Sequence, residues 1–170
     1  LWVVEWALAK GDRIGILSEN RVEYVDAFFA CGKSGVVLVP LNSRLAAPEL
    51  ARLIDDAGIR VVLHSRAHSE LAERVQSLTA VERWRVLEDL DLDQASDLPP
   101  ARCQPEDLWC LLYTSGTTGK PKGVMLPHRM VIWNAYNTVA SWELRADDVA
   151  PVFTPMHHAG GLAVFLTPLF

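Results

Sequence analysis

The residues whose types and spacing most clearly suggest chemistry lie between Tyr113 and Gly123. These eleven residues contain four serine or threonine hydroxyls, three glycines and two lysines. Glycine lets a backbone approach a ligand closely, and successive backbone N–H groups in such a turn form an anion-binding nest. Hydroxyl groups can donate to phosphate oxygens, while lysine supplies a compact positive charge. The segment therefore predicts a binding site for a polyphosphate.

This segment differs from the P-loop of NTPases, which requires Gly-x-x-x-x-Gly-Lys followed by Ser or Thr. When Gly119 and Lys120 are aligned with that pattern, Thr114 stands at the first glycine and Pro121 at the magnesium-binding hydroxyl. The alternative is a flexible Gly/Ser/Thr linker. An apolar run directly before the segment and a Lys-Pro-Lys-Gly ending both argue against a linker.

A second candidate site is the segment from Pro155 to Leu162, in which two adjacent histidines precede three small residues. A zinc site is disfavoured because no third ligand lies at a useful local spacing. On the residues alone, a packed turn without ligand contact and the wall of a binding site remain equally open. The other histidines receive no assignment: His64, His68, His128 and His157.

Short apolar runs alternate with segments of helical periodicity, and these elements must position both candidate sites. Runs of β-branched residues and leucine predict strands at Arg13–Leu17, Val36–Val39, Arg60–Leu63, Trp84–Leu87, Trp109–Tyr113 and Val149–Phe153. Apolar residues at helical spacing predict helices over Asn20–Ser34, Pro48–Ala57, Leu71–Leu78 and Val131–Trp142, with Gly35 and Gly58 ending the first two. Residues 88–106, rich in acidic side chains and proline, predict a solvated connector. The alternation indicates an α/β fold, with a layered, mainly parallel sheet flanked by helices.

Composition excludes several other classes of protein. The 170 residues carry a formal net charge of −5 and no basic run, which gives no electrostatic footprint for nucleic acid or an anionic membrane. No apolar stretch approaches the roughly 18 to 20 residues that span a bilayer. Three cysteines without a Cys-x-x-Cys pair argue against a disulfide framework or zinc site and predict a reducing compartment, the cytoplasm.

The 113–123 segment resembles the phosphate-binding motif of the adenylate-forming (AMP-binding) superfamily, with its Thr-Ser-Gly, Thr-Gly and Pro-Lys-Gly parts in place. That superfamily includes acyl- and aryl-CoA synthetases, luciferases and peptide-synthetase adenylation domains. The resemblance implies that the segment holds the β- and γ-phosphates of ATP and that Lys122 is catalytic. The implied ATP-binding residues are Thr114, Ser115, Gly116, Thr117, Thr118, Gly119 and Lys122.

The segment 155–162 resembles the next motif of the superfamily, which lines the site of the carboxylate substrate. The resemblance implies that His158 is the aromatic gate residue and that Gly160 and Gly161 leave space for an acyl chain or aryl ring. Peptide-synthetase domains typically place an aspartate here for the ammonium of an amino acid. No carboxylate occurs between Pro155 and Phe170, which favours an acid without an α-amino group, such as a fatty or aryl acid.

The reaction implied by the resemblance has two steps: a carboxylic acid and ATP form an acyl-adenylate and pyrophosphate with Mg²⁺, and coenzyme A then accepts the acyl group. The implied fold is the first part of the large N-terminal domain. The later part of that domain, with its Tyr-Gly-x-Thr-Glu segment, and the C-terminal domain are absent from residues 1–170. We therefore expect the chain alone to be inactive.

Two alternatives remain beside an acid–CoA ligase: a peptide-synthetase-type or luciferase-like adenylation domain, and a non-catalytic phosphate-binding module. One local departure from the family pattern is Ala47, before Pro48, where relatives often have threonine. The resulting loss of a helix cap is expected to cost about 1 kcal/mol of stability, without effect on chemistry.

Overall fold

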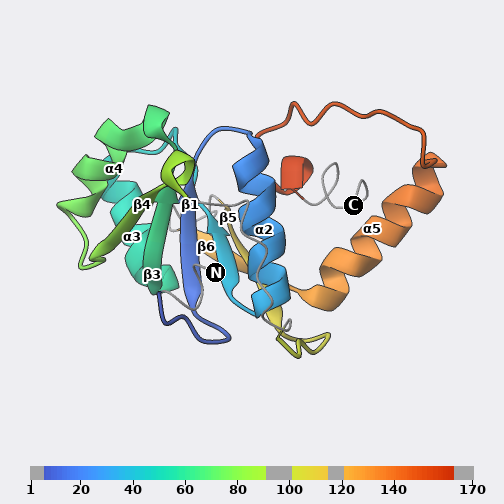
Figure 1. Ribbon diagram of the computed structural model, residues 1–170, viewed down its shortest axis with the longest axis horizontal. Coiled ribbons are helices and arrows are strands. Elements are labelled where there is room, and N and C mark those ends of the chain that lie inside the picture. Colours follow the sequence, from blue (N-terminus) through green and yellow to red (C-terminus); the bar gives the residue numbers. More distant parts are fainter. Residues whose placement is uncertain (1–5, 91–100, 115–120, 163–170) are drawn as a thin grey trace.

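The computed structural model describes residues 6–90, 101–114 and 121–162. Strands in these ranges form a six-stranded sheet in the order β4-β3-β1-β2-β5-β6 (Figure 1). The strands are β1 (Arg13–Leu17), β2 (Val37–Pro40), β3 (Ile59–His64), β4 (Arg83–Val86), β5 (Leu108–Thr114) and β6 (Lys122–Pro127). All neighbouring pairs are parallel except β5 and β6, which are antiparallel. The predicted α/β fold with a mainly parallel sheet is confirmed.

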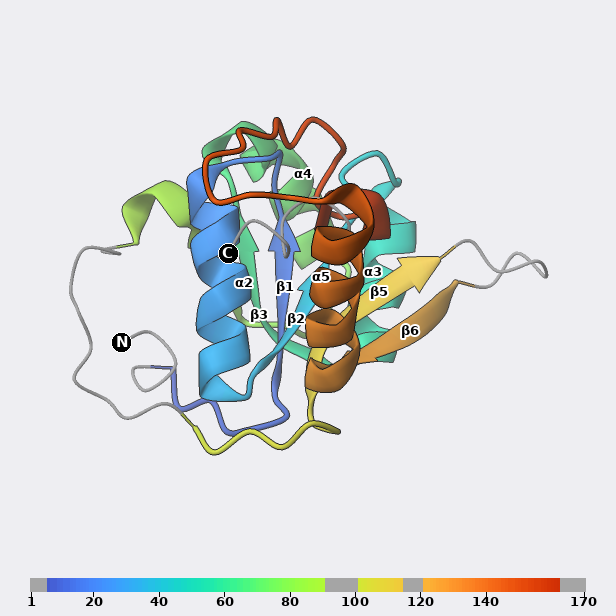
Figure 2. The same ribbon diagram turned by 90° about the vertical axis from the view of Figure 1, so that its right-hand side faces the viewer.

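Helices cover both faces of the sheet. They are α2 (Val22–Ser34), α3 (Ala47–Ala57), α4 (Ser69–Gln76) and α5 (His128–Trp142), with short 3₁₀ helices at Arg66–His68 and Leu87–Asp89. Figure 2 shows α2 and α5 in front of the sheet, with α3 and α4 behind it. The result is a three-layered arrangement in which the sheet is the middle layer.

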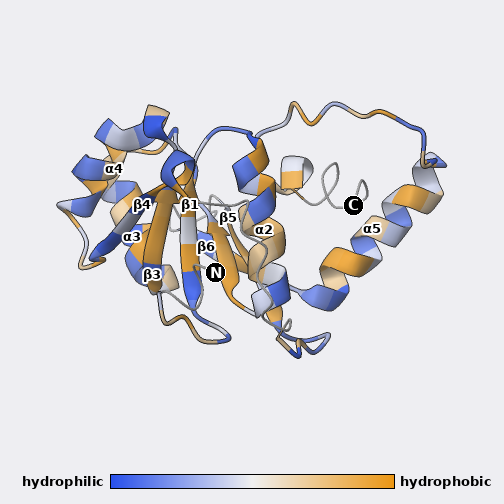
Figure 3. Cartoon of the chain, in the orientation of Figure 1, coloured by the Kyte–Doolittle hydropathy of each residue, from blue (hydrophilic) through white to orange (hydrophobic). Residues whose placement is uncertain are grey.

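The central strands are apolar because both of their faces are covered, as is usual for parallel sheets. Ile14 and Ile16 of β1 pack in the cluster that contains α2, whereas Leu17 packs in the cluster that contains α3. This alternation follows from the two-residue period of a strand. Figure 3 shows largely apolar central strands, whereas the helices carry alternating polar and apolar bands.

The ends of α2 and α3 follow from glycine. Gly35 and Gly58 take the left-handed backbone conformation, with φ of 74° and 61°. Glycine reaches this region without the steric cost that a β-carbon brings. The predicted ends of both helices are confirmed.

In the described part of the chain, no helix combines the length and apolar character that crossing a bilayer requires.

In the C-terminal third, one strand was not predicted and one predicted strand is wrong. Residues Lys122–Pro127 form the unpredicted strand, β6. Val149–Phe153, predicted as a strand, has no regular secondary structure, and Val149 and Phe153 are 96% and 75% exposed. An apolar run becomes a strand only where a neighbouring strand is available for backbone pairing, and β6 takes the place beside β5.

The start of α3 offers a test of helix capping. The N-cap is Ala46, whereas the sequence predicted the cap position at Ala47, one residue later. Its backbone N–H donates to the Glu49 carboxylate at 3.0 Å, but alanine has no oxygen to return a hydrogen bond. We expect Ala46→Ser to raise the free energy of unfolding by about 0.5 to 1 kcal/mol, measured by denaturant titration of the complete protein.

The control for this prediction is Ala47→Ser, because Ala47 is buried and lies within the first turn. It should give no gain. Stabilisation by Ala47→Ser but not by Ala46→Ser would place the cap one residue later.

Candidate functional site

The hairpin formed by β5 and β6 carries both ends of the predicted phosphate-binding segment. Thr114, the last residue of β5, lies directly opposite Lys122, the first residue of β6. Residues Ser115, Gly116, Thr117, Thr118 and Gly119 lie outside the described residues. The hairpin therefore holds the two described members of the predicted set, Thr114 and Lys122, side by side.

A cavity of about 470 Å³ lies beside this hairpin. It is bounded by β5, β6, helix α5 and the turn that contains the paired histidines. The residues that line it are Leu112, Tyr113, Thr114, Val124, Leu126, Met130, Val131, Asn134, His157, His158 and Ala159. Most of the lining is apolar, as is common in small-molecule sites. The structure thus brings Thr114 and His158 to one cavity.

Lys122 belongs to the same face of the hairpin as the cavity. In the register of the two strands, Leu112 pairs with Val124 and Thr114 pairs with Lys122. Side chains directly opposite each other in a sheet share a face, and the same face recurs every second residue. Leu112, Thr114 and Val124 all line the cavity, so Lys122 projects on that face, with its side chain exposed to solvent.

Tyr113 fixes the hairpin to the helix behind it. Its hydroxyl donates to the carboxylate of Asp56, at the end of α3, at 2.5 Å. Burial and the neighbouring Asp56 raise the pKa of Tyr113 well above its usual range, so this group remains a hydrogen-bond donor. The contact ties the last turn of α3 to the strand position just before Thr114.

The paired histidines differ in their surroundings. His157 is only 9% exposed, whereas His158 is exposed, and the centroids of the two rings are 4.4 Å apart. Burial, together with the nearby His158 and Arg44, lowers the pKa of His157 to about 4. His157 is therefore neutral near pH 7. The wall of the cavity thus contains one buried neutral imidazole and one imidazole open to solvent.

Packing explains one of the two predicted glycines of this segment, Gly161. Gly160 and Gly161 are not among the described residues that line the cavity. A β-carbon at Gly161 would collide with the carbonyl oxygens of Thr154 and Pro155. The backbone N–H of His158 also donates to the Pro155 carbonyl at 3.0 Å. Among the described residues, close packing around Gly161 therefore explains why this position is a glycine. Its predicted contact with the substrate stays a prediction.

The described residues do not form a magnesium site by themselves. They contain no group of three or more His, Cys, Asp or Glu side chains that could hold a metal ion. Magnesium prefers oxygen ligands. The side-chain oxygens of the described lining are the Thr114 hydroxyl, the Asn134 amide and the Tyr113 hydroxyl, which donates to Asp56.

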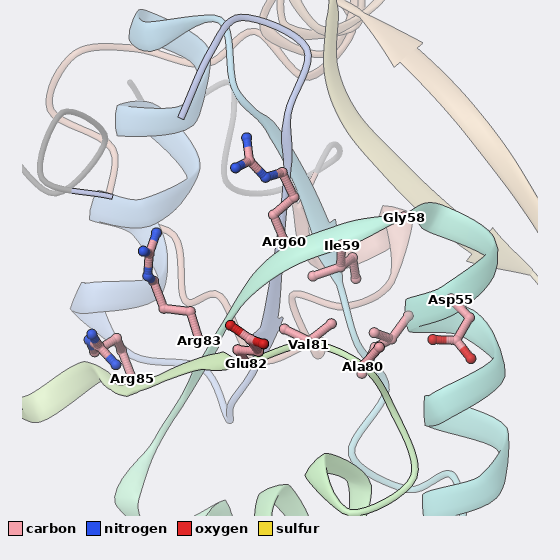
Figure 4. Close-up of a pocket in the computed structure, with 10 residues that line it drawn as sticks. Asp55, Gly58, Ile59, Arg60, Ala80, Val81, Glu82, Arg83 and Arg85 are labelled. Carbon is pink, nitrogen blue, oxygen red and sulfur yellow. The ribbon is translucent and has the colours of Figure 1, made fainter. Parts of the chain in front are cut away.

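A second, larger cavity of about 630 Å³ lies at the opposite edge of the sheet, at the beginnings of β3 and β4. Figure 4 shows Arg60, Arg83 and Arg85 around it. Arg60 is paired with Asp12 at 2.5 Å, and Arg83 donates to the backbone carbonyl of Trp6 at 2.7 Å. Ligands of parallel α/β sheets bind at the carboxyl ends of the strands. The cavity beside Thr114 lies at the carboxyl end of β5, whereas the cavity near the three arginines lies at the amino ends of β3 and β4.

The low pKa of His157 gives a prediction about acid stability. Between pH 6.5 and about 4 the unfolded chain binds a proton that the folded protein does not, so stability falls as the pH falls through this range. His157→Phe removes this contribution. Over that range, we expect the free energy of unfolding to fall by on the order of 1 kcal/mol less in this variant than in the unmodified protein. Urea unfolding at pH 7, 5.5 and 4.5 measures the difference.

The matched control is His158→Phe, because His158 is exposed beside His157. This variant should keep most of the pH dependence of the unmodified protein. An equal pH dependence in His157→Phe and the unmodified protein would show that His157 does not stay neutral in the fold.

Sequence reasoning missed several residues of this site. His157 was left unassigned, and the lining residues Val124, Leu126 and Met130 received no role. The short apolar run Val124–Leu126 after the glycine-rich segment is only a weak signal for β6, because seven residues separate Thr114 from Lys122 and the short turns that identify a hairpin have fewer. No local signal could have identified His157 as buried.

Comparisons with known proteins show similarity over almost the whole chain. The family model described as "AMP-binding enzyme" matches residues 4–170. A feruloyl-CoA synthase from an Amycolatopsis species is 41% identical over 159 residues, which are 93% of this chain and 32% of that protein. The long-chain-fatty-acid–CoA ligase FadD13 of Mycobacterium tuberculosis is 32% identical over 166 residues, which are 94% of this chain and 33% of that protein. The chain therefore spans 32–33% of the length of these relatives.

Solved structures show the same similarity. The crystal structure of ATP-bound MatB from Rhodopseudomonas palustris matches with a TM-score of 0.85 at 28% identity. The match covers 98% of this chain and 35% of that structure. The arrangement of sheet and helices is therefore shared over almost all of the chain.

Proposed function

Because the chain belongs to the AMP-binding enzyme family, we propose that the whole protein is an AMP-forming acid–CoA ligase. It activates a carboxylic acid with ATP and transfers the acyl group to coenzyme A. The observation that carries this proposal is the cavity of about 470 Å³, which joins Thr114, at the start of the phosphate-binding segment, to His158. An acid in this cavity would lie beside a nucleotide whose phosphates rest on the segment 114–122.

In the first step, an oxygen of the substrate carboxylate attacks the α-phosphorus of ATP. The bond from that phosphorus to the bridging oxygen breaks, and pyrophosphate leaves. Negative charge grows on the departing oxygens, and the Lys122 ammonium and the Thr114 hydroxyl can stabilise it as preorganised donors. In the second step, the thiol of coenzyme A loses its proton and attacks the acyl carbon, and AMP leaves.

The lining of the cavity supports an apolar acid without an α-amino group. Among the described residues that line it, none is an aspartate or glutamate that could pair with an ammonium group. Burying an ammonium group without a partner is costly. Leu112, Val124 and Leu126 instead offer an apolar surface. We propose a fatty or aryl acid as substrate, in keeping with the names of the two relatives.

We propose that residues 1–170 form the first part of the AMP-binding domain and that later parts of the whole protein complete the site. ATP would enter as its magnesium complex, with ligands from outside the described residues. The three free cysteines suit a reducing compartment, so we place the reaction in the cytoplasm. Two of them, Cys31 and Cys110, are fully buried.

A direct test is to incubate the complete protein with ATP, coenzyme A and one acid at a time, and to analyse the products by mass spectrometry. We expect AMP and the corresponding acyl-CoA in equal amounts. AMP and a bound acyl-adenylate without acyl-CoA would favour another acceptor, as in a peptide-synthetase-type or luciferase-like protein. Binding of ATP without any acid-dependent product would favour a non-catalytic phosphate-binding module.

A further inference from the structure

Asn20 connects two parts of the chain that are more than 130 residues apart. Its side-chain nitrogen donates to the carbonyl oxygens of Val152 at 3.1 Å and Thr154 at 2.9 Å. Its side-chain oxygen accepts a hydrogen bond from the backbone N–H of Met156 at 2.8 Å. Both N–H donors and the oxygen of the amide are therefore engaged by one backbone segment.

The segment that Asn20 holds leads directly into the wall of the cavity. Residues 149–155 have no regular secondary structure, and Met156, which is buried, immediately precedes His157. Figure 1 shows the chain after α5 returning from the far end of that helix to the beginning of α2. Asn20, just before α2, meets the chain there. Its three hydrogen bonds fasten the backbone of residues 152–156, which directly precedes the paired histidines.

The loop that contains Asn20 is held by the residues on either side of it, Glu19 and Arg21. The carboxylate of Glu19 accepts a hydrogen bond from the Ser65 hydroxyl at 2.6 Å, and the backbone N–H of Ser65 donates to Leu17 at 3.1 Å. On the other side, the guanidinium of Arg21 donates to Glu23 at 2.8 and 2.9 Å. These contacts tie the loop to the carboxyl end of β3 and to the first turn of α2. The amide of Asn20 is thus preorganised.

We infer that Asn20 is a positioning residue for the carboxylic acid, acting through the segment that carries His157 and His158. This inference rests on the proposed function, because it concerns the acid that enters the cavity. A displaced histidine wall changes the shape of the acid site while the phosphate-binding hairpin stays in place. Asn20 therefore controls the affinity for the acid and leaves the affinity for ATP unchanged.

The test uses Asn20→Ala and Asn20→Asp in the complete protein, with acid-dependent ATP–pyrophosphate exchange as the assay. Asn20→Ala should raise KM for the acid by about 10-fold or more and change KM for ATP less than about twofold, since small misplacements are costly in such sites. Asparagine and aspartate have nearly the same shape, but the aspartate would direct an oxygen toward two carbonyl groups. Asn20→Asp should therefore be at least as impaired as Asn20→Ala.

The matched control is Ser34→Ala, which removes a hydrogen bond of 3.1 Å from a side chain to the Cys31 carbonyl at the other end of α2. Both KM values should then remain as in the unmodified protein. An unchanged KM for the acid in both Asn20 variants would overturn the inference, as would an Asn20→Asp variant that behaves like the unmodified protein.

Hydrogen exchange separates this inference from the proposed function. In Asn20→Ala, the peptide that contains residues 152–158 should exchange its amide hydrogens faster, whereas the peptide from the middle of α2 should not. This readout requires no turnover. If the unmodified protein activates no acid, the proposed function fails. Unchanged amide hydrogen exchange at residues 152–158 in Asn20→Ala would contradict the positioning role, whatever the activity assay shows.

Discussion

Replacing Lys122 by alanine in the complete protein is expected to slow acid-dependent adenylate formation by about 10² to 10³-fold, the usual effect of deleting one preorganised donor to a developing charge. Lys122 lies directly opposite Thr114 and on the face of the hairpin that borders the cavity. In the proposed reaction its charge would act mainly on the departing pyrophosphate. We therefore expect kcat and kcat/KM for the acid to fall together, as they do when an interaction exists only in the transition state.

Lys120→Ala is the appropriate control, because it removes the same charge two residues away at a position outside the set of residues implied to bind ATP. It should retain activity within about a few-fold of the unmodified protein. Circular dichroism and the unfolding midpoint would show that both variants fold. Adenylation by Lys122→Ala at the unmodified rate would remove Lys122 from the mechanism.

The second large effect is expected from Gly32→Ala in helix α2. Alanine is the better helix former by about 0.5 to 1 kcal/mol, so this change would stabilise an exposed helix. Here a β-carbon would collide with the indole of Trp109. That indole stacks on Phe28, with ring centroids 4.9 Å apart, and donates to the Phe28 carbonyl at 2.8 Å. We expect a net loss of about 1 to 3 kcal/mol, as in other overpacked cores.

A double-mutant cycle tests the cause of this loss. In a Trp109→Leu background the obstructing ring is gone, so Gly32→Ala should cost clearly less than it does alone. The free energy of unfolding of the four proteins, from denaturant titration, supplies the comparison. Strictly additive losses would mean that the contact with Trp109 is not the reason for glycine at this position.

Much of the fold could be predicted because its signals are local. The apolar run Arg13–Leu17 and the stripe of α2 each define one element, and Gly35 marks the end of that helix. The edge strand β6 carries a weaker signal. Four of its six residues are exposed, so it lacks the apolar alternation of a half-buried strand. The seven residues between Thr114 and Lys122 also exceed the short turns that identify a hairpin from sequence.

The candidate site could be predicted only in part. Thr114, Lys122 and His158 were proposed from motif resemblance, and the structure places Thr114 and His158 on one cavity. The cavity itself depends on how α5 and β6 pack, which no single segment encodes. The role of Asn20 depends on contacts with residues 152–156. In the sequence, Asn20 resembles an ordinary residue before a helix, so its function appears only in three dimensions.

The most direct test of the central proposal is carboxylate-dependent exchange of pyrophosphate into ATP by the complete protein. The panel should contain short, medium and long fatty acids, aryl acids and amino acids. The proposed function predicts exchange with at least one class of fatty or aryl acids and none with amino acids. Exchange with amino acids alone, or no exchange with any acid by a folded protein, would contradict it.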